Sequence, residues 1–169
     1  KKKIYTNITF VDIAGLVKGA SKGEGLGNKF LSHIREVDAI IHLVRCFESD
    51  KITHVNSKIN PVDDLETIKT EIILSDLDII QKKLEKGKKK LLEEKEIKIL
   101  EDKLKQLNDG KEVIANDKNE EKFLNTLGLL SIKPKIIVCN VDEESVAKGN
   151  SFTESVKKNY SEEKVVTIC

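Results

Sequence analysis

Residues 10–16 read Phe10-Val11-Asp12-Ile13-Ala14-Gly15-Leu16, and this stretch is the most informative part of the sequence for predicting the fold. The apolar run that ends at Val11 predicts a strand over residues 4–11. A carboxylate, Asp12, follows that strand directly, and a glycine stands three residues later. From Gly15 to Gly27 the chain carries five of its nine glycines, which predicts a loop with unusual backbone freedom.

This order of residues is typical of proteins that switch on a hydrolysable phosphate. In such a site an acid at the end of a strand holds magnesium directly or through water, and a glycine N–H reaches the terminal phosphate. The pattern D-x-x-G specifies only two positions, so a strand that simply ends in a glycine turn is the competing interpretation. The usual phosphate cradle, G-x-x-x-x-G-K-[ST], does not occur in these 169 residues.

The rest of the chain predicts a parallel α/β sheet with flanking helices. Apolar runs of the buried-strand type cover residues 38–44 and 135–139, and a further strand is expected at 165–169. Helical patterns precede or separate them at residues 28–37, from about 118, and at 152–160. Strands that alternate with helices in this way favour a parallel sheet, because crossover helices connect parallel strands.

A helical hairpin interrupts this alternation. Asp63 and Asp64 begin an amphipathic helix that Gly87 ends within a lysine-rich turn. A second helix follows, with apolar residues at steps of three and four, and the two predict an antiparallel coiled-coil hairpin. We therefore divide the chain into a first part of a nucleotide-binding domain (1–62), a hairpin insertion (63–114) and a second part of that domain (115–169).

Composition narrows the classes of function. The net charge is +1, so any nucleic-acid footprint must be local, and 4% aromatic residues argue against a base-stacking surface. There is no run of about 18 apolar residues that could span a bilayer. Three widely spaced cysteines suit a reducing compartment, so we expect a cytoplasmic protein without a membrane partner. Because the chain contains no methionine, we expect it to be a segment of a longer protein.

A second motif, Asn140-Val141-Asp142-Glu143, directly follows a predicted strand. GTPases place N-K-x-D there, and the final Asp accepts two hydrogen bonds from guanine. Here Val141 replaces the Lys, and Glu143, one methylene longer, replaces the Asp, so the guanine contact is crowded or misplaced. Adenine offers one donor and one acceptor on that edge, so the loop backbone would have to read it. A polar turn after a strand is an equally good interpretation of this motif alone.

The first motif in its full form, VDIAGLVKGASKGEGLGN at 11–28, together with NVDE at 140–143, resembles the YchF/Obg-like ATPases. These are translation-factor-class P-loop proteins that prefer ATP to GTP. The likeness continues through FLSHIREVDAIIHLVRCFE (30–48) and DDLETIKTEIILSDLD (63–78), and the hairpin falls where that family has its coiled coil. The resemblance implies a P-loop NTPase-like fold. It also implies that the family's phosphate loop and its C-terminal TGS domain lie outside these residues.

The resemblance implies roles for the matching positions. Asp12 would be the acid linked to Mg²⁺, and Gly15 the contact to the γ-phosphate. Leu16 stands where many GTPases carry a water-orienting Gln, which implies slow hydrolysis by another route and leaves no catalytic residue assigned. The base-site positions implied are Asn140, Val141, Glu143 and Cys169, of which Cys169 opens the last base-contacting loop.

Two groups of side chains outside these motifs have competing interpretations. Six lysines crowd the hairpin turn and are either a solvated tip or a contact to the phosphates of ribosomal RNA: Lys82, Lys83, Lys86, Lys88, Lys89 and Lys90. The three histidines lack a shared metal spacing, and His42 is expected to be a satisfied core residue.

We expect the intact protein to be a Mg²⁺-dependent ATP-hydrolysing switch that associates with the ribosome and binds GTP more weakly than ATP. The 169 residues alone are expected to be inactive. Two alternatives stay open. One is an Obg-type GTPase, and the other is a non-enzymatic binding module that works through the hairpin.

Overall fold

The computed structural model describes residues 6–13, 31, 33–49, 59–87 and 92–169. Their centre is a parallel sheet of three strands in the order β1-β2-β3. The strands are β1 (Ile40–Arg45), β2 (Lys135–Asn140) and β3 (Val165–Ile168). Each lies within two residues of the strand predicted from its apolar run, and the parallel pairing confirms the predicted fold class.

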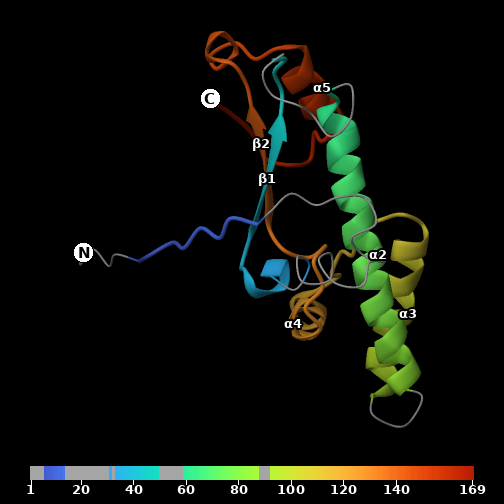
Figure 1. The fold of residues 1–169 in the computed structure, drawn as a ribbon. Helices are drawn as coiled ribbons and strands as arrows, with labels where there is room; N and C mark the ends of the chain where they lie inside the picture. The colour runs from blue at the N-terminus through green and yellow to red at the C-terminus, as the bar shows by residue number, and fades with distance from the viewer. Residues whose placement is uncertain (1–5, 14–30, 32, 50–58, 88–91) are drawn as a thin grey trace.

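Two helices cover one face of this sheet. Figure 1 shows α2 (Pro61–Gly87) and α5 (Ser151–Asn159) on the same side of β1 and β2. The core between them is apolar and closed to solvent, with Leu65 of α2 2% exposed and Val156 of α5 fully buried. The sheet contributes the following residues to this core: Val44, Cys46, Ile137, Cys139 and Val141. Burial of these side chains is what fixes the strands against the helices.

The predicted hairpin consists of α2 and α3 (Glu94–Asn108), which run side by side (Figure 1). A second core holds them together and includes the short helix α4 (Lys118–Thr126). Its fully buried residues include Ile80, Leu100 and Leu124, one from each helix. Because α2 spans 27 residues, it belongs both to the cover of the sheet and to the hairpin. The division of the chain at residues 63 and 114 stays a prediction.

The predicted strand over residues 4–11 is wrong for its described part. Residues 6–13 form no strand, and Figure 1 shows this segment leaving the sheet next to β1. Ile8 is 77% exposed and Phe10 78% exposed. Alternating apolar residues make a strand only when a neighbour accepts their hydrogen bonds and a surface buries one face. Among the described residues no strand pairs with this segment, and its residues Ile8, Phe10 and Val11 are exposed. Ile13, at its end, packs against a buried core.

The helical predictions are confirmed where they can be compared. Residues 31 and 33–36 are helical, in agreement with the helix predicted over 28–37, and α4 begins at Lys118 as expected. The glycine-rich run from Gly15 to Gly27 and the lysine-rich turn at 88–91 lie outside the described residues. In the described part of the chain, no helix has the length and apolar character needed to cross a membrane.

Candidate nucleotide site

The register of the sheet brings the carboxyl ends of the three strands to one edge. Arg45 of β1 is opposite Asn140 of β2, and Asn140 is opposite Ile168 of β3. The backbone pairing continues past the strands, because the Cys46 N–H donates to the Asn140 carbonyl at 2.7 Å and the Val141 N–H donates to the Ile168 carbonyl at 2.9 Å. Open α/β sheets bind ligands outside the carboxyl ends of their strands, so this edge is the candidate site.

All four residues predicted to line a base lie at this edge. Asn140 ends β2 and is half-buried, whereas Val141 directly after it is only 2% exposed. Glu143 begins a short 3₁₀ helix, η1 (Glu143–Ser145), and is exposed. Cys169 follows β3 and is also exposed. The structure therefore brings the loop after β2 and the residue after β3 together, as the predicted site requires.

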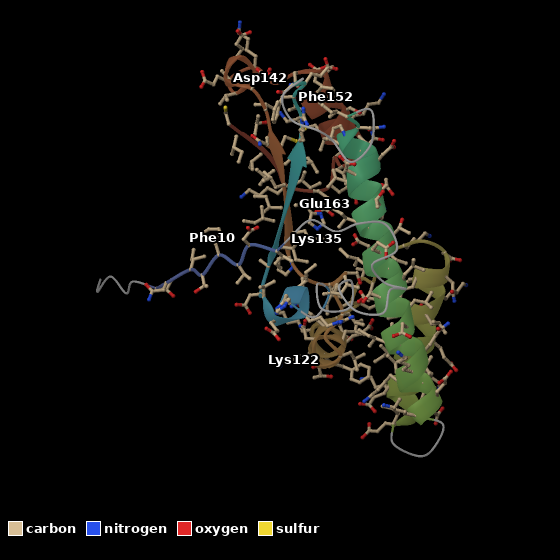
Figure 2. The ribbon with its side chains drawn as sticks, viewed as in Figure 1. Phe10, Lys122, Lys135, Asp142, Phe152 and Glu163 are labelled. Carbon is tan, nitrogen blue, oxygen red and sulfur yellow. The ribbon has the colours of Figure 1, made fainter. Side chains whose placement is uncertain are left out.

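A side-chain cap gives the loop after β2 its shape. The Asp142 carboxylate accepts a hydrogen bond from the Ser145 N–H at 2.9 Å and so caps η1 (Figure 2 labels Asp142 at this end of the sheet). The Ser145 hydrogen bond holds the pKa of Asp142 below its ordinary value. Because Asp142 is engaged in the cap, Glu143 is the next carboxylate of this loop that can face a ligand.

Two residues that position this edge of the sheet were not predicted from the sequence. The Asn150 side chain donates to the Cys46 carbonyl at 2.7 Å, while its oxygen caps α5 by accepting from the Thr153 N–H. Arg45 folds back over the chain after β1, with its Nε donating to the Phe47 carbonyl at 3.0 Å and its guanidinium 4.8 Å from the Phe47 ring. A capping box, Asn150 with Thr153 three residues later, was the available signal for Asn150.

A buried polar cluster connects the helical residues 33–36 to α2 and to the chain before β2. The Asp76 carboxylate is fully buried and accepts hydrogen bonds from the N–H groups of Leu130 and Ser131, each at 2.8 Å, and from the Ser131 hydroxyl at 2.6 Å. Burial is the largest influence on Asp76 and raises its pKa, although these hydrogen bonds oppose the shift. Arg35 donates to the neighbouring Ser75 Oγ at 2.5 Å.

The phosphate half of the predicted site is described only in part. Gly15 and Leu16 lie outside the described residues, and Asp12 is exposed. The segment 6–13 that carries Asp12 runs away from the strand ends, and Figure 2 shows Phe10 well separated from Asp142.

Asp12 is the residue that the sequence predicts to hold Mg²⁺. Within the described ranges no group of three His, Cys, Asp or Glu side chains could enclose a metal ion. Mg²⁺ usually takes one or two carboxylates and completes its shell with water and substrate phosphates. A single exposed carboxylate such as Asp12 fits that mode of binding.

His42 is half-buried on β1, and the described lysines of the hairpin-turn cluster lie on α2. Burial, and secondarily the charge of Lys135, lower the pKa of His42 to about 4, so its imidazole is neutral at pH 7. Lys82 forms an ion pair with Asp78 at 2.7 Å in α2. Lys83 and Lys86 also lie in the last turns of α2, whereas Lys88, Lys89 and Lys90 lie outside the described residues.

Comparison with known families identifies the fold described above. The family model described as "50S ribosome-binding GTPase" matches residues 1–168. The chain belongs to this family. Among curated proteins it is similar to "Ribosome-binding ATPase YchF" of Bacillus subtilis, with 41% identity over all of this chain and 49% of the relative. The protein of the same name from Haemophilus ducreyi is 44% identical over 99% of this chain and 48% of the relative.

A solved structure agrees with these relatives. The chain superposes on the structure described as that of the Schizosaccharomyces pombe YchF GTPase with a TM-score of 0.74 and 32% identity. The match covers 92% of this chain and 46% of that one. The resemblance to the YchF proteins inferred from residues 11–28 and 140–143 is confirmed. The chain spans about half the length of the curated relatives that it matches.

Proposed function

We propose that the chain is the nucleotide-binding part of a Mg²⁺-dependent, ATP-hydrolysing switch protein that acts on the ribosome in the cytoplasm. The observation that carries this proposal is the meeting of Asn140, Val141, Glu143 and Cys169 at the carboxyl edge of a parallel sheet. A ligand-binding edge in a member of a GTPase family supports a nucleotide as the ligand. The names of the YchF relatives support ATP hydrolysis and ribosome binding.

Adenine is the base that this edge suits better. Asp142 is occupied as the cap of η1, so Glu143 is the carboxylate left to meet a base. Its side chain is longer than the Asp that pairs with guanine. Val141 next to Asn140 lies in the apolar core of the sheet, where an unpaired lysine would be costly. The loop backbone then reads the base, with Cys169 beside it. GTP binds the same edge less tightly.

Asp12, Gly15 and Leu16 would serve the phosphate end. Asp12 would hold Mg²⁺ through its carboxylate, and the ion supplies neutralisation of charge on the phosphates when bound. The Gly15 N–H would contact the γ-phosphate. Leu16 offers no hydrogen bond to a water, so this chain's own side chains leave hydrolysis slow. No catalytic residue is assigned.

Competition binding on the full-length protein tests the base preference. A fluorescent ATP analogue is displaced by ATP or by GTP, and ATP should act at the lower concentration. Glu143→Asp shortens the carboxylate and should move the ratio toward GTP by about tenfold or more. Glu144→Asp, at the neighbouring exposed position, is the matched control. If GTP displaces the analogue from the unaltered protein as well as ATP does, the Obg-type GTPase is the better description.

The role of Asp12 has a separate test. Asp12→Asn removes the charge but keeps the shape, so hydrolysis by the full-length protein should need more Mg²⁺ for half-maximal rate. An unchanged magnesium requirement would contradict this assignment. Failure of the full-length protein to bind any nucleotide would favour the non-enzymatic binding module instead.

Ribosome contact is proposed for the lysines at the hairpin tip. Each lysine near an RNA phosphate adds affinity that weakens with salt. Replacing Lys83 and Lys86 by Gln, together with Lys88, Lys89 and Lys90, should reduce co-sedimentation with ribosomes and flatten its dependence on salt. Lys82 is left in place in this variant because it already pairs with Asp78. Unchanged co-sedimentation would locate the ribosome contact elsewhere.

A further inference from the structure

The hairpin has a groove along one side, between α2 and α3. Its volume is about 380 Å³, and six residues line it: Gln81, Leu84, Glu85, Ile97, Glu101 and Leu104. Leu84 is 9% exposed, and Ile97 and Leu104 are half-buried, so they form an apolar floor. The other three side chains are exposed and form the rim.

The groove has the dimensions of a helix-binding site. Ile97 and Leu104 are seven residues apart on α3, which is two helical turns or roughly 10 Å. On α2 the lining residues Gln81, Leu84 and Glu85 follow a spacing of three and four and therefore share one face. Leu84 of α2 and Ile97 and Leu104 of α3 thus form one apolar strip between the two helices, the kind of surface on which a third helix packs in a coiled coil. A helix with apolar anchors at i, i+3 or i+4, and i+7 matches the floor.

The charge of the rim selects the partner. Glu85 stands on the α2 wall and Glu101 on the α3 wall, so a carboxylate lies on each side of the apolar floor. Neither forms an ion pair with another residue in the part of the chain that the structure describes. Helical periodicity places Lys83 and Lys86 away from the face that carries Gln81 and Glu85. The two charged side chains that line the groove are therefore both glutamates, and they are separate from the lysine-bearing face of α2. The lysines nearest to them on these helices are Lys82 and Lys98, which pair with Asp78 and Glu94, and Lys105, four residues after Glu101.

The geometry points to a binding site for a basic amphipathic helix of another protein. Its apolar stripe would cover Leu84, Ile97 and Leu104, and lysine or arginine on both flanks of that stripe would meet Glu85 and Glu101. This is the arrangement in which e and g positions choose the partner in a coiled coil. The site is independent of the nucleotide edge and leaves the lysine-bearing face free for RNA.

A pair of synthetic peptides tests this site on the full-length protein. Both peptides have three heptads with Leu at a and d. One carries Lys at every e and g, and the other carries Glu there, so like charges keep each monomeric. Anisotropy of a fluorescent label measures binding. The basic peptide should bind at least about tenfold more tightly than the acidic peptide.

Charge reversal identifies the groove as the place of binding. The variant with Glu85→Lys and Glu101→Lys should bind the basic peptide about tenfold more weakly and should gain affinity for the acidic one. The matched control carries Glu36→Lys and Glu162→Lys, two exposed glutamates outside the hairpin, and has the same net charge. Its peptide affinities should stay close to those of the unaltered protein.

Three results would overturn the inference. They are no preference of the unaltered protein for the basic peptide, equal loss of affinity in the groove variant and the control variant, and no gain for the acidic peptide in the groove variant. The gain does not depend on lost stability, because an unfolded hairpin would not acquire a specific preference. Nucleotide binding should be the same in both variants, so failure here leaves the proposed function untouched.

Discussion

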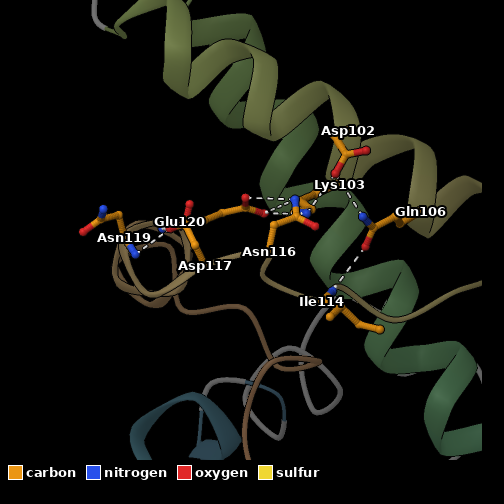
Figure 3. Close-up of polar contacts among 8 residues, drawn as sticks. All are labelled: Asp102, Lys103, Gln106, Ile114, Asn116, Asp117, Asn119 and Glu120. Atoms are coloured by element: carbon orange, nitrogen blue, oxygen red, sulfur yellow. Dashed lines mark hydrogen bonds and ion pairs between the residues drawn. The ribbon is translucent and has the colours of Figure 1, made fainter.

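Replacing Lys103 by Met is expected to lower the free energy of unfolding by about 3–5 kcal/mol. Lys103 lies on α3 and is fully buried, yet its Nζ is 2.5 Å from Glu120 Oε1 and 2.8 Å from Asp102 Oδ2 (Figure 3). Burial disfavours its charge, but the hydrogen bonds to Asp102 and Glu120 outweigh that effect and raise the pKa of Lys103. The side chain is therefore ionised at neutral pH and joins the hairpin to α4.

The size of this stability loss is set by the unpaired carboxylate that the Lys103→Met substitution leaves in the core. Opposite charges 2.5 Å apart attract by roughly 6–7 kcal/mol at an effective dielectric constant of about 20. Removing two ions from water costs several kcal/mol each, so the intact pair adds little net stability. Met fills a similar volume but leaves the Glu120 carboxylate, which is 7% exposed, with the Asn116 amide as its remaining partner among the described residues. The cost of the single substitution is the cost of that stranded carboxylate.

Urea unfolding followed by circular dichroism measures the effect, and a second variant tests the reasoning. Adding Glu120→Gln to Lys103→Met neutralises the stranded carboxylate, so at least half of the lost stability should return. Lys98→Met removes an exposed lysine, 73% accessible and paired with Glu94, and should cost less than about 1 kcal/mol. A double variant no more stable than Lys103→Met alone would refute the account of a stranded charge.

Three further perturbations have defined outcomes in the same unfolding assay. The pKa of His42 is lowered to about 4 in the folded protein, so the free energy of unfolding should fall by about 3 kcal/mol as the pH drops from 6.5 to 4. His42→Gln should remove this contribution to the pH dependence, whereas replacing the exposed His33 by Gln should leave it in place. Asp76→Ala should cost about 3 kcal/mol or more, because two buried N–H groups lose their acceptor. Gly149 has φ +76°, and an added Cβ would lie 2.7 Å from the Thr153 hydroxyl oxygen. Gly149→Ala should therefore lower the free energy of unfolding more than Gly110→Ala, because Gly110 has a similar φ of +72° but open space around it.

The predictions from sequence succeeded where periodicity and burial agree. The apolar runs at 38–44 and 135–139 became β1 and β2, and the stripe after Asp63 became α2, because each pattern has a surface to bury against. The strand predicted at 4–11 failed over its described part, where the same kind of pattern has no neighbour and Phe10 is exposed. An apolar pattern shows that a segment can form a strand, but the strand forms only where a neighbouring strand pairs with it.

Site prediction shows the same division. The motif at 140–143 and its place after a strand located the loop, and the structure put Cys169 beside it through the pairing of β2 with β3. The residues that hold the edge in shape were not visible as a set. Asn150 reaches Cys46 across 104 positions of sequence, and Asp76 reaches Ser131 across 55. Hydrogen bonds between residues so far apart in the sequence produce no local pattern from which they could be predicted.

The sequence by itself determined the family, the alternation of strands and helices and the hairpin, and it predicted residues that would meet a nucleotide. Those features depend on local chemistry: apolar spacing, helix ends and short motifs that read the same in any context. Only the tertiary structure decided that the predicted base-site residues share one edge, that Lys103 and Glu120 form a buried pair, and that a groove with two glutamates lies along one side of the hairpin. These features depend on which distant segments burial brings into contact, because the same charges and carboxylates in water would be solvated separately.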